Sequence, residues 1–375
     1  MKEQKEKNFE SALKVQQGIE QPSSVSPYGI AHKKKKRILS RDEYVNGILS
    51  GDRVVMSMAI TLIESSLPSH YALAQEIVNA CLPHSGQSIR IGITGVPGVG
   101  KSTFIESFGK LLTSKGHKVA VLAIDPSSER SKGSILGDKT RMEDLSVDEN
   151  AFIRPSPSAG SLGGVARKTR EIIVLCEAAG FDRIIVETVG VGQSEISVHS
   201  MVDFFLLLML SGAGDELQGI KRGIMEMADL LVVNKADGDN VEKANLAKTQ
   251  YTSAMRLFPV NESKWQAFAE TCSALNHKGI ENIHSIIEDY VKITTENGYF
   301  IEKRNKQSGY ILKEFIQRHL TQNFYMAPQI KSTLMEMELN VARGSISPYN
   351  AGQILLENYF ELLRNKQILC NFDEF

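Results

Sequence analysis

The chain has 375 residues, of which 42% are hydrophobic and 23% charged, and its formal net charge is −1. This length suits one large globular domain with extensions, or two domains, and the near-neutral charge argues against nucleic acid or an anionic membrane as a partner. Four scattered cysteines without a CxxC pair argue against a disulfide framework or a zinc site and fit a reducing compartment.

The first 88 residues divide into a charged segment and a helical one. Residues 1–40 are polar, which predicts a flexible N-terminus, and they lack the apolar core of a secretion signal, so we expect a cytoplasmic protein. The basic run at 32–37 favours a solvated segment over a localisation or nucleic-acid patch in an otherwise neutral chain. Residues 41–88 have helical periodicity and predict a helical N-terminal extension, with Ser69 as one N-cap.

Between residues 89 and 295, short β-rich runs alternate with helical stretches. The runs that fit strands are 89–95, 118–125, 183–190, 203–210, 229–237 and 265–274. Several are almost continuously apolar, as strands buried on both faces are. The alternation predicts an α/β domain with a mostly parallel sheet flanked by helices. The most apolar run, 204–210, is far too short to span a membrane.

The strand pattern stops near residue 295, and 296–375 is expected to be helical. In the last helix, Ser347 fits the N-cap and Pro348 the first helical position. Its apolar stripe consists of Ala351, Leu355, Tyr359, Leu362 and Leu363. This stripe either packs against its own chain or pairs with a second copy, and the sequence leaves both possibilities open.

The stretch GVPGVGKST fits the P-loop pattern, which predicts a P-loop NTPase. It follows a strand and begins a helix, so backbone N–H groups and the positive end of the helix face the phosphates. We expect Lys101 to reach the β- and γ-phosphates as a catalytic residue and the Ser102 hydroxyl to bind Mg²⁺. The predicted phosphate-binding residues are Gly95, Val96, Pro97, Gly98, Val99, Gly100, Lys101, Ser102 and Thr103.

The base is predicted from NKAD, at the end of a later strand. The Asp237 carboxylate can accept hydrogen bonds from guanine N1–H and the exocyclic amine together, whereas adenine lacks this donor pair. Lys235 can lie along the ring, and Asn234 can tie this loop to the P-loop. A second loop is expected to bind guanine O6 through its backbone, at Ser273, Ala274 and Leu275. GTP is therefore the predicted nucleotide.

Carboxylates at strand ends near the phosphates can hold Mg²⁺ directly or through water. Asp125 and Glu187 each follow an apolar strand, while Asp138 lies in a polar loop. For Asp125 and Glu187 we favour a metal role over that of solvated loop residues, and for Asp138 the two readings stay open.

A switch segment is predicted after Glu187. The N–H of Gly190 is placed to sense the γ-phosphate, so this segment is expected to order with GTP and loosen after hydrolysis. Many GTPases have a glutamine directly after this glycine to orient the attacking water, but here the position is Val191, and Gln193 lies two residues further on. We therefore predict slow intrinsic hydrolysis, accelerated by a partner or by dimer formation.

Six stretches together resemble the MeaB/ArgK group of GTPases: GVPGVGKST, AIDPSS, GSILGDKTRM, ETVGVGQSE, GAGDELQGIKRG and NKAD. The resemblance spans about residues 45–375. It implies a homodimer with a C-terminal dimerisation arm, and a chaperone that gates adenosylcobalamin loading and protects methylmalonyl-CoA mutase. It also implies that Ser102, Asp125, Asp138 and Glu187 surround Mg²⁺. Within 212–223, which matches a nucleotide-responsive segment of the family, the charged candidates are Asp215 and Lys221.

Three other functions fit the sequence less well. Delivery of a metal such as nickel needs a Cys/His cluster near the P-loop or the N-terminus, but His32 and His84 stand alone in the sequence. An ATPase or kinase linked to lysine, arginine and ornithine transport fits poorly with NKAD and with the lack of membrane segments. A nucleic-acid GTPase lacks a broad basic signal.

Overall fold

The computed structural model describes residues 38–65, 67–125, 142–157, 162–188, 194–212, 222–259 and 262–364. The chain divides into two units, Met1–Ser40 and Arg41–Phe375, and the helices and strands given below all belong to the second. The predicted flexible N-terminus lies outside the described residues except at 38–40, so it stays a prediction.

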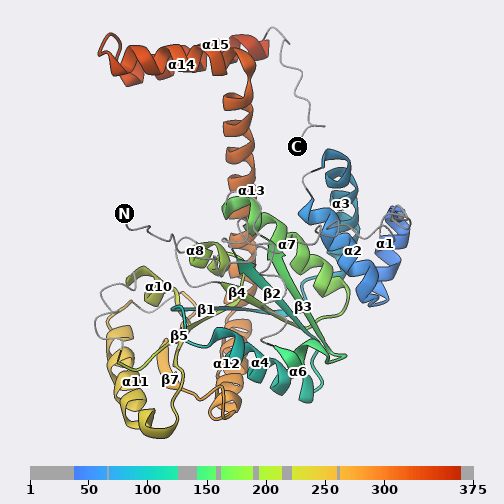
Figure 1. Ribbon diagram of the computed structural model, residues 1–375, viewed down its shortest axis with the longest axis vertical. Coiled ribbons are helices and arrows are strands. Elements are labelled where there is room, and N and C mark those ends of the chain that lie inside the picture. The colour runs from blue at the N-terminus through green and yellow to red at the C-terminus, as the bar shows by residue number, and fades with distance from the viewer. Residues whose placement is uncertain are drawn as a thin grey trace, which may run out of the picture. The chain divides into compact units, whose positions relative to one another are not determined.

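The centre of the second unit is a parallel seven-stranded sheet in the order β3-β2-β4-β1-β5-β6-β7 (Figure 1). Its strands are β1 Ile89–Gly95, β2 Val119–Asp125, β3 Ala151–Pro157, β4 Arg183–Thr188, β5 Phe204–Met209, β6 Leu230–Val233 and β7 Phe268–Thr271. The six predicted strands and the parallel α/β architecture are therefore confirmed.

The seventh strand, β3, is missing from the sequence-based prediction. It contains Pro155 and Pro157, which cannot donate hydrogen bonds to a neighbouring strand. Proline is tolerated on edge strands, and β3 lies at the edge of the sheet, paired only with β2 among the strands of the described chain.

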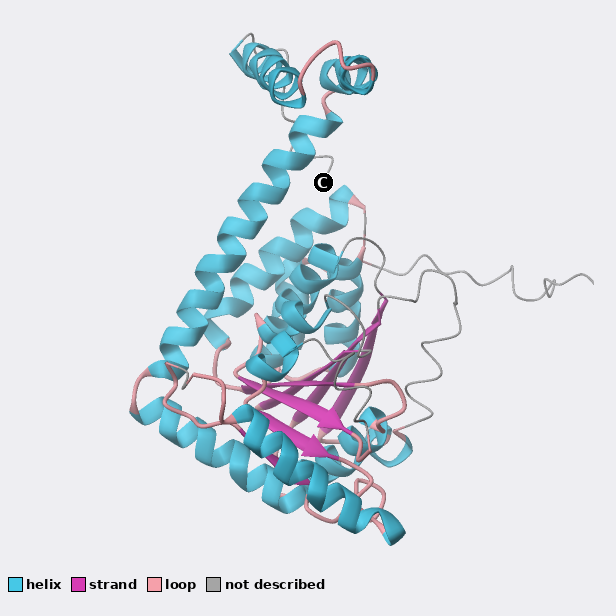
Figure 2. Ribbon diagram, turned by 90° about the vertical axis from the view of Figure 1, so that its left-hand side faces the viewer, coloured by secondary structure: helices cyan, strands magenta, loops and turns pink. Residues whose placement is uncertain are grey.

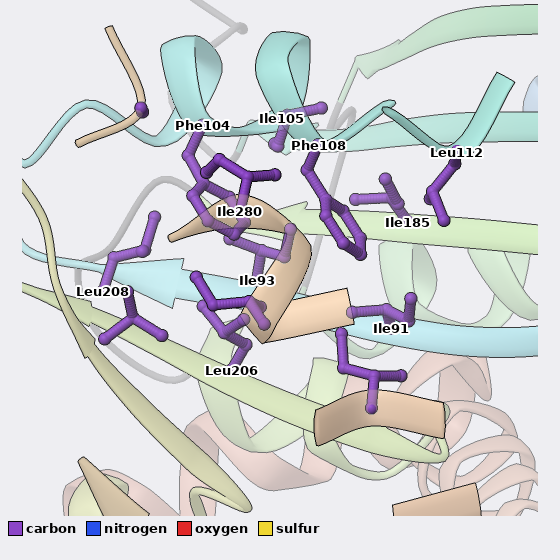
Figure 3. Packing of buried hydrophobic residues seen from close by; sticks show 14 of the residues in the cluster. Ile91, Ile93, Phe104, Ile105, Phe108, Leu112, Ile185, Leu206, Leu208 and Ile280 are labelled. Atoms are coloured by element: carbon purple, nitrogen blue, oxygen red, sulfur yellow. The ribbon is translucent and has the colours of Figure 1, made fainter. Parts of the chain in front are cut away.

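Helices cover both faces of the sheet (Figure 2). One face carries α4 Lys101–Ser114, α6 Glu143–Ser146 and α12 Ile280–Glu296, and the other carries α7 Leu162–Ala178 and α8 Ser194–His199. Ile91 and Ile93 of β1 point to the first face, where they pack in a common core with Phe104 and Phe108 of α4 (Figure 3). Gly92 points to the opposite face, because a Cβ added there would lie 3.0 Å from the Val198 side chain of α8.

Three helices precede the sheet: α1 Arg41–Leu49, α2 Arg53–Glu64 and α3 Pro68–Cys81, followed by a short 3₁₀ turn at Leu82–His84. Asp52 caps α2 by accepting hydrogen bonds from the backbone N–H groups of Val54 and Val55, at 2.8 and 3.1 Å. The prediction of Ser69 as an N-cap is wrong. Because Pro68 occupies the first helical position, Leu67 is the cap residue and Ser69 lies inside the helix.

Between β5 and β7 the chain forms α10 Arg222–Met227, a 3₁₀ turn at Gly238–Asn240 and α11 Val241–Met255. Beyond α12 it is helical: α13 Tyr299–Met326, α14 Pro328–Ala342 and α15 Pro348–Arg364. None of the helices in the described part of the chain combines the length and apolar character that a membrane span requires.

The cap predicted for α15 is confirmed, because the N–H of Asn350 donates to the Ser347 hydroxyl at 3.2 Å. In the apolar stripe of α15, Ala351, Leu355 and Tyr359 are buried within this chain, and Tyr359 packs against Ile330 of the neighbouring α14. Figure 1 shows α14 and α15 lying side by side. Packing against its own chain is thus observed for these residues, and pairing with a second copy stays a prediction.

The N-terminal part of α13 is fixed to the sheet by a buried ion pair. Arg304 donates to both carboxylate oxygens of Asp203, at 2.8 and 2.6 Å, and Asp203 is only 1% exposed. Lys303 and Tyr290 donate to the Asp203 backbone oxygen at 2.6 and 3.1 Å. Since Asp203 directly precedes β5, these bonds hold α13 at the edge where the strands begin, opposite the edge that carries the P-loop.

Candidate nucleotide site

The segment between β1 and α4 has the backbone conformation that a phosphate-binding loop needs. Gly98 and Gly100 adopt φ values of 79° and 93°, a region that glycine enters without a steric penalty. A Cβ on Gly95 would lie 2.5 Å from the Leu208 backbone oxygen, so this position also requires glycine. The loop therefore curls tightly between β1 and the N-terminus of α4, where N–H groups can face an anion.

Lys101 lies at the first position of α4 and turns back over this loop. Its Nζ donates to the backbone oxygen of Gly95 at 2.9 Å. Burial lowers the pKa of Lys101, while the negative charges of Glu187 and Glu195 act in the opposite direction. The ammonium group thus lies on the loop, where it can meet a bound phosphate and where the charges of two carboxylates favour its protonated form.

Asn234 joins the NKAD loop to the P-loop, as the sequence predicts. It is 2% exposed, and its Nδ2 donates to the Val99 backbone oxygen at 2.9 Å. On its other side, its Oδ1 accepts hydrogen bonds from the Ala274 N–H at 3.1 Å and the Cys272 thiol at 3.3 Å. One buried amide therefore connects three segments that are far apart in the sequence.

The remaining predicted base residues lie beside this amide. The Ser273 hydroxyl donates to the Asp237 carboxylate, and Lys235 reaches back to the Gly98 backbone oxygen at 2.9 Å. Lys235 has a φ of 60°, and the Asn240 amide donates to its backbone oxygen at 2.7 Å. Leu275 is 73% exposed. The structure thus brings together Asn234, Lys235, Asp237 and 273–275 next to the P-loop.

Two of the four predicted magnesium ligands have described side chains. Ser102 is the second residue of α4, and Glu187 is 8% exposed at the end of β4, which runs between β1 and β2. Asp125 ends β2 at the same edge of the sheet, but its side chain and the whole of Asp138 lie outside the described residues. Among the side chains that are described, no group of three or more His, Cys, Asp or Glu could hold a metal ion.

The predicted switch residues Gly190 and Gln193, with Asp215 and Lys221, also lie outside the described residues. A neighbouring residue, Glu195 near the start of α8, was not singled out from the sequence. It is 1% exposed, and its charge acts on Lys101. The only sequence signal is its place directly after the predicted switch, and nothing there distinguishes a buried acid from an exposed one.

Comparisons with known proteins agree with this geometry. The family described as "Methylmalonyl Co-A mutase-associated GTPase MeaB" matches residues 56–329. GTPase ArgK of Escherichia coli strain K12 is 44% identical over 323 residues, covering 85% of this chain and 98% of that protein. The mitochondrial methylmalonic aciduria type A homolog of Mus musculus is 42% identical over 341 residues, covering 88% of this chain and 81% of that protein.

Among solved structures, one described as a LAO/AO transport system kinase superposes with a TM-score of 0.72 at 37% identity. It covers 86% of this chain and 99% of that one. The family match spans more than half of the chain, and the relatives align along most of their lengths. The chain therefore belongs to the MeaB family of P-loop GTPases.

Proposed function

We propose that this GTPase is a chaperone of methylmalonyl-CoA mutase: it binds and hydrolyses GTP, gates adenosylcobalamin loading and protects the mutase. The description of the family names association with this mutase, and the Mus musculus relative is named after methylmalonic aciduria. For nucleotide binding, the observation that carries the proposal is the buried Asn234 amide, which holds the NKAD loop against the P-loop. We further propose a cytoplasmic location, supported by free buried thiols at Cys81, Cys176 and Cys272, which fit a reducing compartment.

Different residues of the site would bind different parts of GTP. The P-loop N–H groups and Lys101 hold the phosphates, and the Asp237 carboxylate orients the guanine. A hydroxyl and a buried carboxylate are ligands that suit Mg²⁺, so Ser102 and Glu187 would hold the ion, with Asp125 and Asp138 as further candidates. Bound there, the ion would neutralise phosphate charge.

We propose that hydrolysis is slow in the isolated protein. The residue after Gly190 is Val191, which has no polar group to orient an attacking water. Completion of the site by a partner, or by dimer formation, would accelerate hydrolysis. If the partner is the mutase, GTP hydrolysis depends on its presence, as expected of a chaperone that couples hydrolysis to adenosylcobalamin loading.

We also propose a homodimer that pairs through the C-terminal helices, because α13–α15 leave many large apolar side chains exposed. More than half of the surface of each of these side chains is exposed: Ile301, Tyr310, Leu312, Leu320, Tyr325, Met326, Met335, Leu339, Tyr349 and Phe360. Exposed apolar surface on this scale is typical of protein–protein interfaces. Leu320→Glu with Leu339→Glu should therefore yield monomers in sedimentation analysis, whereas unchanged dimers would contradict this interface.

A second candidate is an ATP-dependent kinase of a transport system, which the description of the similar solved structure states for that protein. Against it stands the pairing of the Asp237 carboxylate with the Ser273 hydroxyl beside the P-loop, which suits guanine. Nucleotide selectivity separates the two candidates, because a transport kinase should prefer ATP.

Co-purification with methylmalonyl-CoA mutase tests the chaperone proposal. The tagged protein should retain mutase with a non-hydrolysable GTP analogue to a different extent than with GDP. Lys101→Ala serves as the matched control, since it removes the phosphate-binding ammonium and should abolish this nucleotide dependence. Failure to retain mutase in any nucleotide state would contradict the proposal.

A further inference from the structure

A second link joins the predicted base loop to the helix that carries the phosphate-binding residues. The Ser107 hydroxyl on α4 lies 2.6 Å from Nδ1 of His277, across 170 residues of sequence. We propose that Ser107 and His277 are positioning residues that hold loop 273–278 against α4 and thereby slow the release of guanine nucleotide. This inference rests on the proposed contact of 273–275 with the base.

The loop is folded so that His277 turns towards α4. Its ends are closed by a pair of backbone hydrogen bonds between Ser273 and Lys278, at 3.0 and 3.1 Å, and the Asn276 N–H donates to the Ser273 hydroxyl at 3.2 Å. His277 itself has a φ of 55°, a left-handed conformation that is uncommon for residues other than glycine. A backbone held in this region implies that surrounding contacts select it.

The Ser107 side of the link is rigid. Ser107 is 4% exposed and lies in the second turn of α4, whose first two residues are Lys101 and Ser102. Its hydroxyl is therefore fixed relative to the phosphate-binding residues, while the His277 ring belongs to an exposed loop. A hydrogen bond between a rigid helix and a surface loop restricts the loop more than the helix.

The link lies at a different place from the Asn234 amide. Asn234 holds the start of the loop, through the Ala274 N–H, whereas Ser107 holds the far end at His277. A loop attached at one end can swing about that attachment, but a loop attached at both ends cannot. The two links together therefore fix the separation between the phosphate contacts and the guanine contacts, so a bound nucleotide meets a preformed site.

Dissociation of a fluorescent N-methylanthraniloyl-GDP, chased with unlabelled GDP, measures the effect. Removing one hydrogen bond of this kind should speed release about three- to tenfold in Ser107→Ala. His277→Ala should do the same, and the double variant should be no faster than the faster single variant, because both remove the same link. Ser114→Ala is the matched control: this serine lies on the same helix and its hydroxyl bonds only to the Leu111 backbone oxygen in the described structure.

A conservative substitution at His277 distinguishes a positioning role from a general loss of stability. His277→Asn retains a polar atom near the Nδ1 position and tolerates a positive φ, so its release rate should stay within about twofold of the unaltered protein. Unchanged release in Ser107→Ala and His277→Ala, or rate effects that multiply in the double variant, would overturn the proposal. A lowered melting temperature with unchanged release would also count against it.

A further variant distinguishes failure of this inference from failure of the base site. Asp237→Asn should shift preference from GDP towards xanthosine diphosphate, because the amide can donate to the xanthine 2-oxo group. If Asp237→Asn keeps its GDP preference, the base assignment itself is wrong. If it shifts as expected while Ser107→Ala releases GDP normally, the base site stands and the role of Ser107 and His277 is refuted.

Discussion

Replacing Asn234 with alanine removes the amide that holds three segments together at the base of the nucleotide site. The Val99 backbone oxygen and the Ala274 N–H lose their partner at 2.9 and 3.1 Å, and both residues are buried. An unsatisfied buried backbone group costs about 1–3 kcal/mol, so for two such groups we expect a loss of about 2–6 kcal/mol in the free energy of unfolding. For a chain of this size, that corresponds to a melting temperature lower by about 3–8 °C.

Nucleotide affinity should fall as well, because the NKAD loop loses its attachment to the P-loop. A loss of about 1.5–3 kcal/mol in binding corresponds to GDP affinity that is roughly 10- to 100-fold weaker. Thermal unfolding without nucleotide and titration with a fluorescent GDP measure the two effects separately. Asn276→Ala is the control, since its exposed side chain lies in the same base loop. An Asn234→Ala protein with unchanged stability and GDP affinity would refute this reasoning.

Three further predictions concern the scaffold. Arg304→Ala leaves the buried Asp203 carboxylate without its guanidinium, so urea unfolding should show a loss of about 3 kcal/mol, and an unchanged midpoint would argue against the anchor. Burial lowers the pKa of His199 to about 4 from 6.5, so the unfolded chain takes up a proton at a pH where the folded one does not. The free energy of unfolding should therefore fall as the pH drops from about 6.5 towards 4, and equal pH dependence in His199→Gln would disprove this cause. Gly279→Ala places a Cβ 2.7 Å from the Thr271 oxygen at a φ of 78°, which should cost about 1–3 kcal/mol in stability; tolerance in thermal unfolding would show that the backbone relaxes there.

Those parts of the fold that show up as local patterns could be predicted from the sequence. The runs that form β5 and β6 are continuously apolar, because helices cover both faces of the sheet. β3 was missed because its prolines mask the pattern, and only its edge position makes them tolerable. The N-cap predicted at Ser347 is confirmed, whereas the one predicted at Ser69 is wrong, because α3 begins at Pro68, two positions earlier than predicted.

Only part of the nucleotide site could be predicted from the sequence. The P-loop is a contiguous motif, and the tie from Asn234 to Val99 follows from two strand ends that meet at one edge of a parallel sheet. The contact between Ser107 and His277 joins residues 170 positions apart, of common types, with no spacing that marks either one. Such contacts depend on how a loop lies on a helix, which only the folded chain determines.

The rate of GTP hydrolysis, measured with and without methylmalonyl-CoA mutase, tests the central claim most directly. We expect slow turnover by the isolated protein and faster turnover when the mutase is added. A turnover near 10 per second without any partner, as is typical of metabolic enzymes, and unchanged by the mutase, would contradict it.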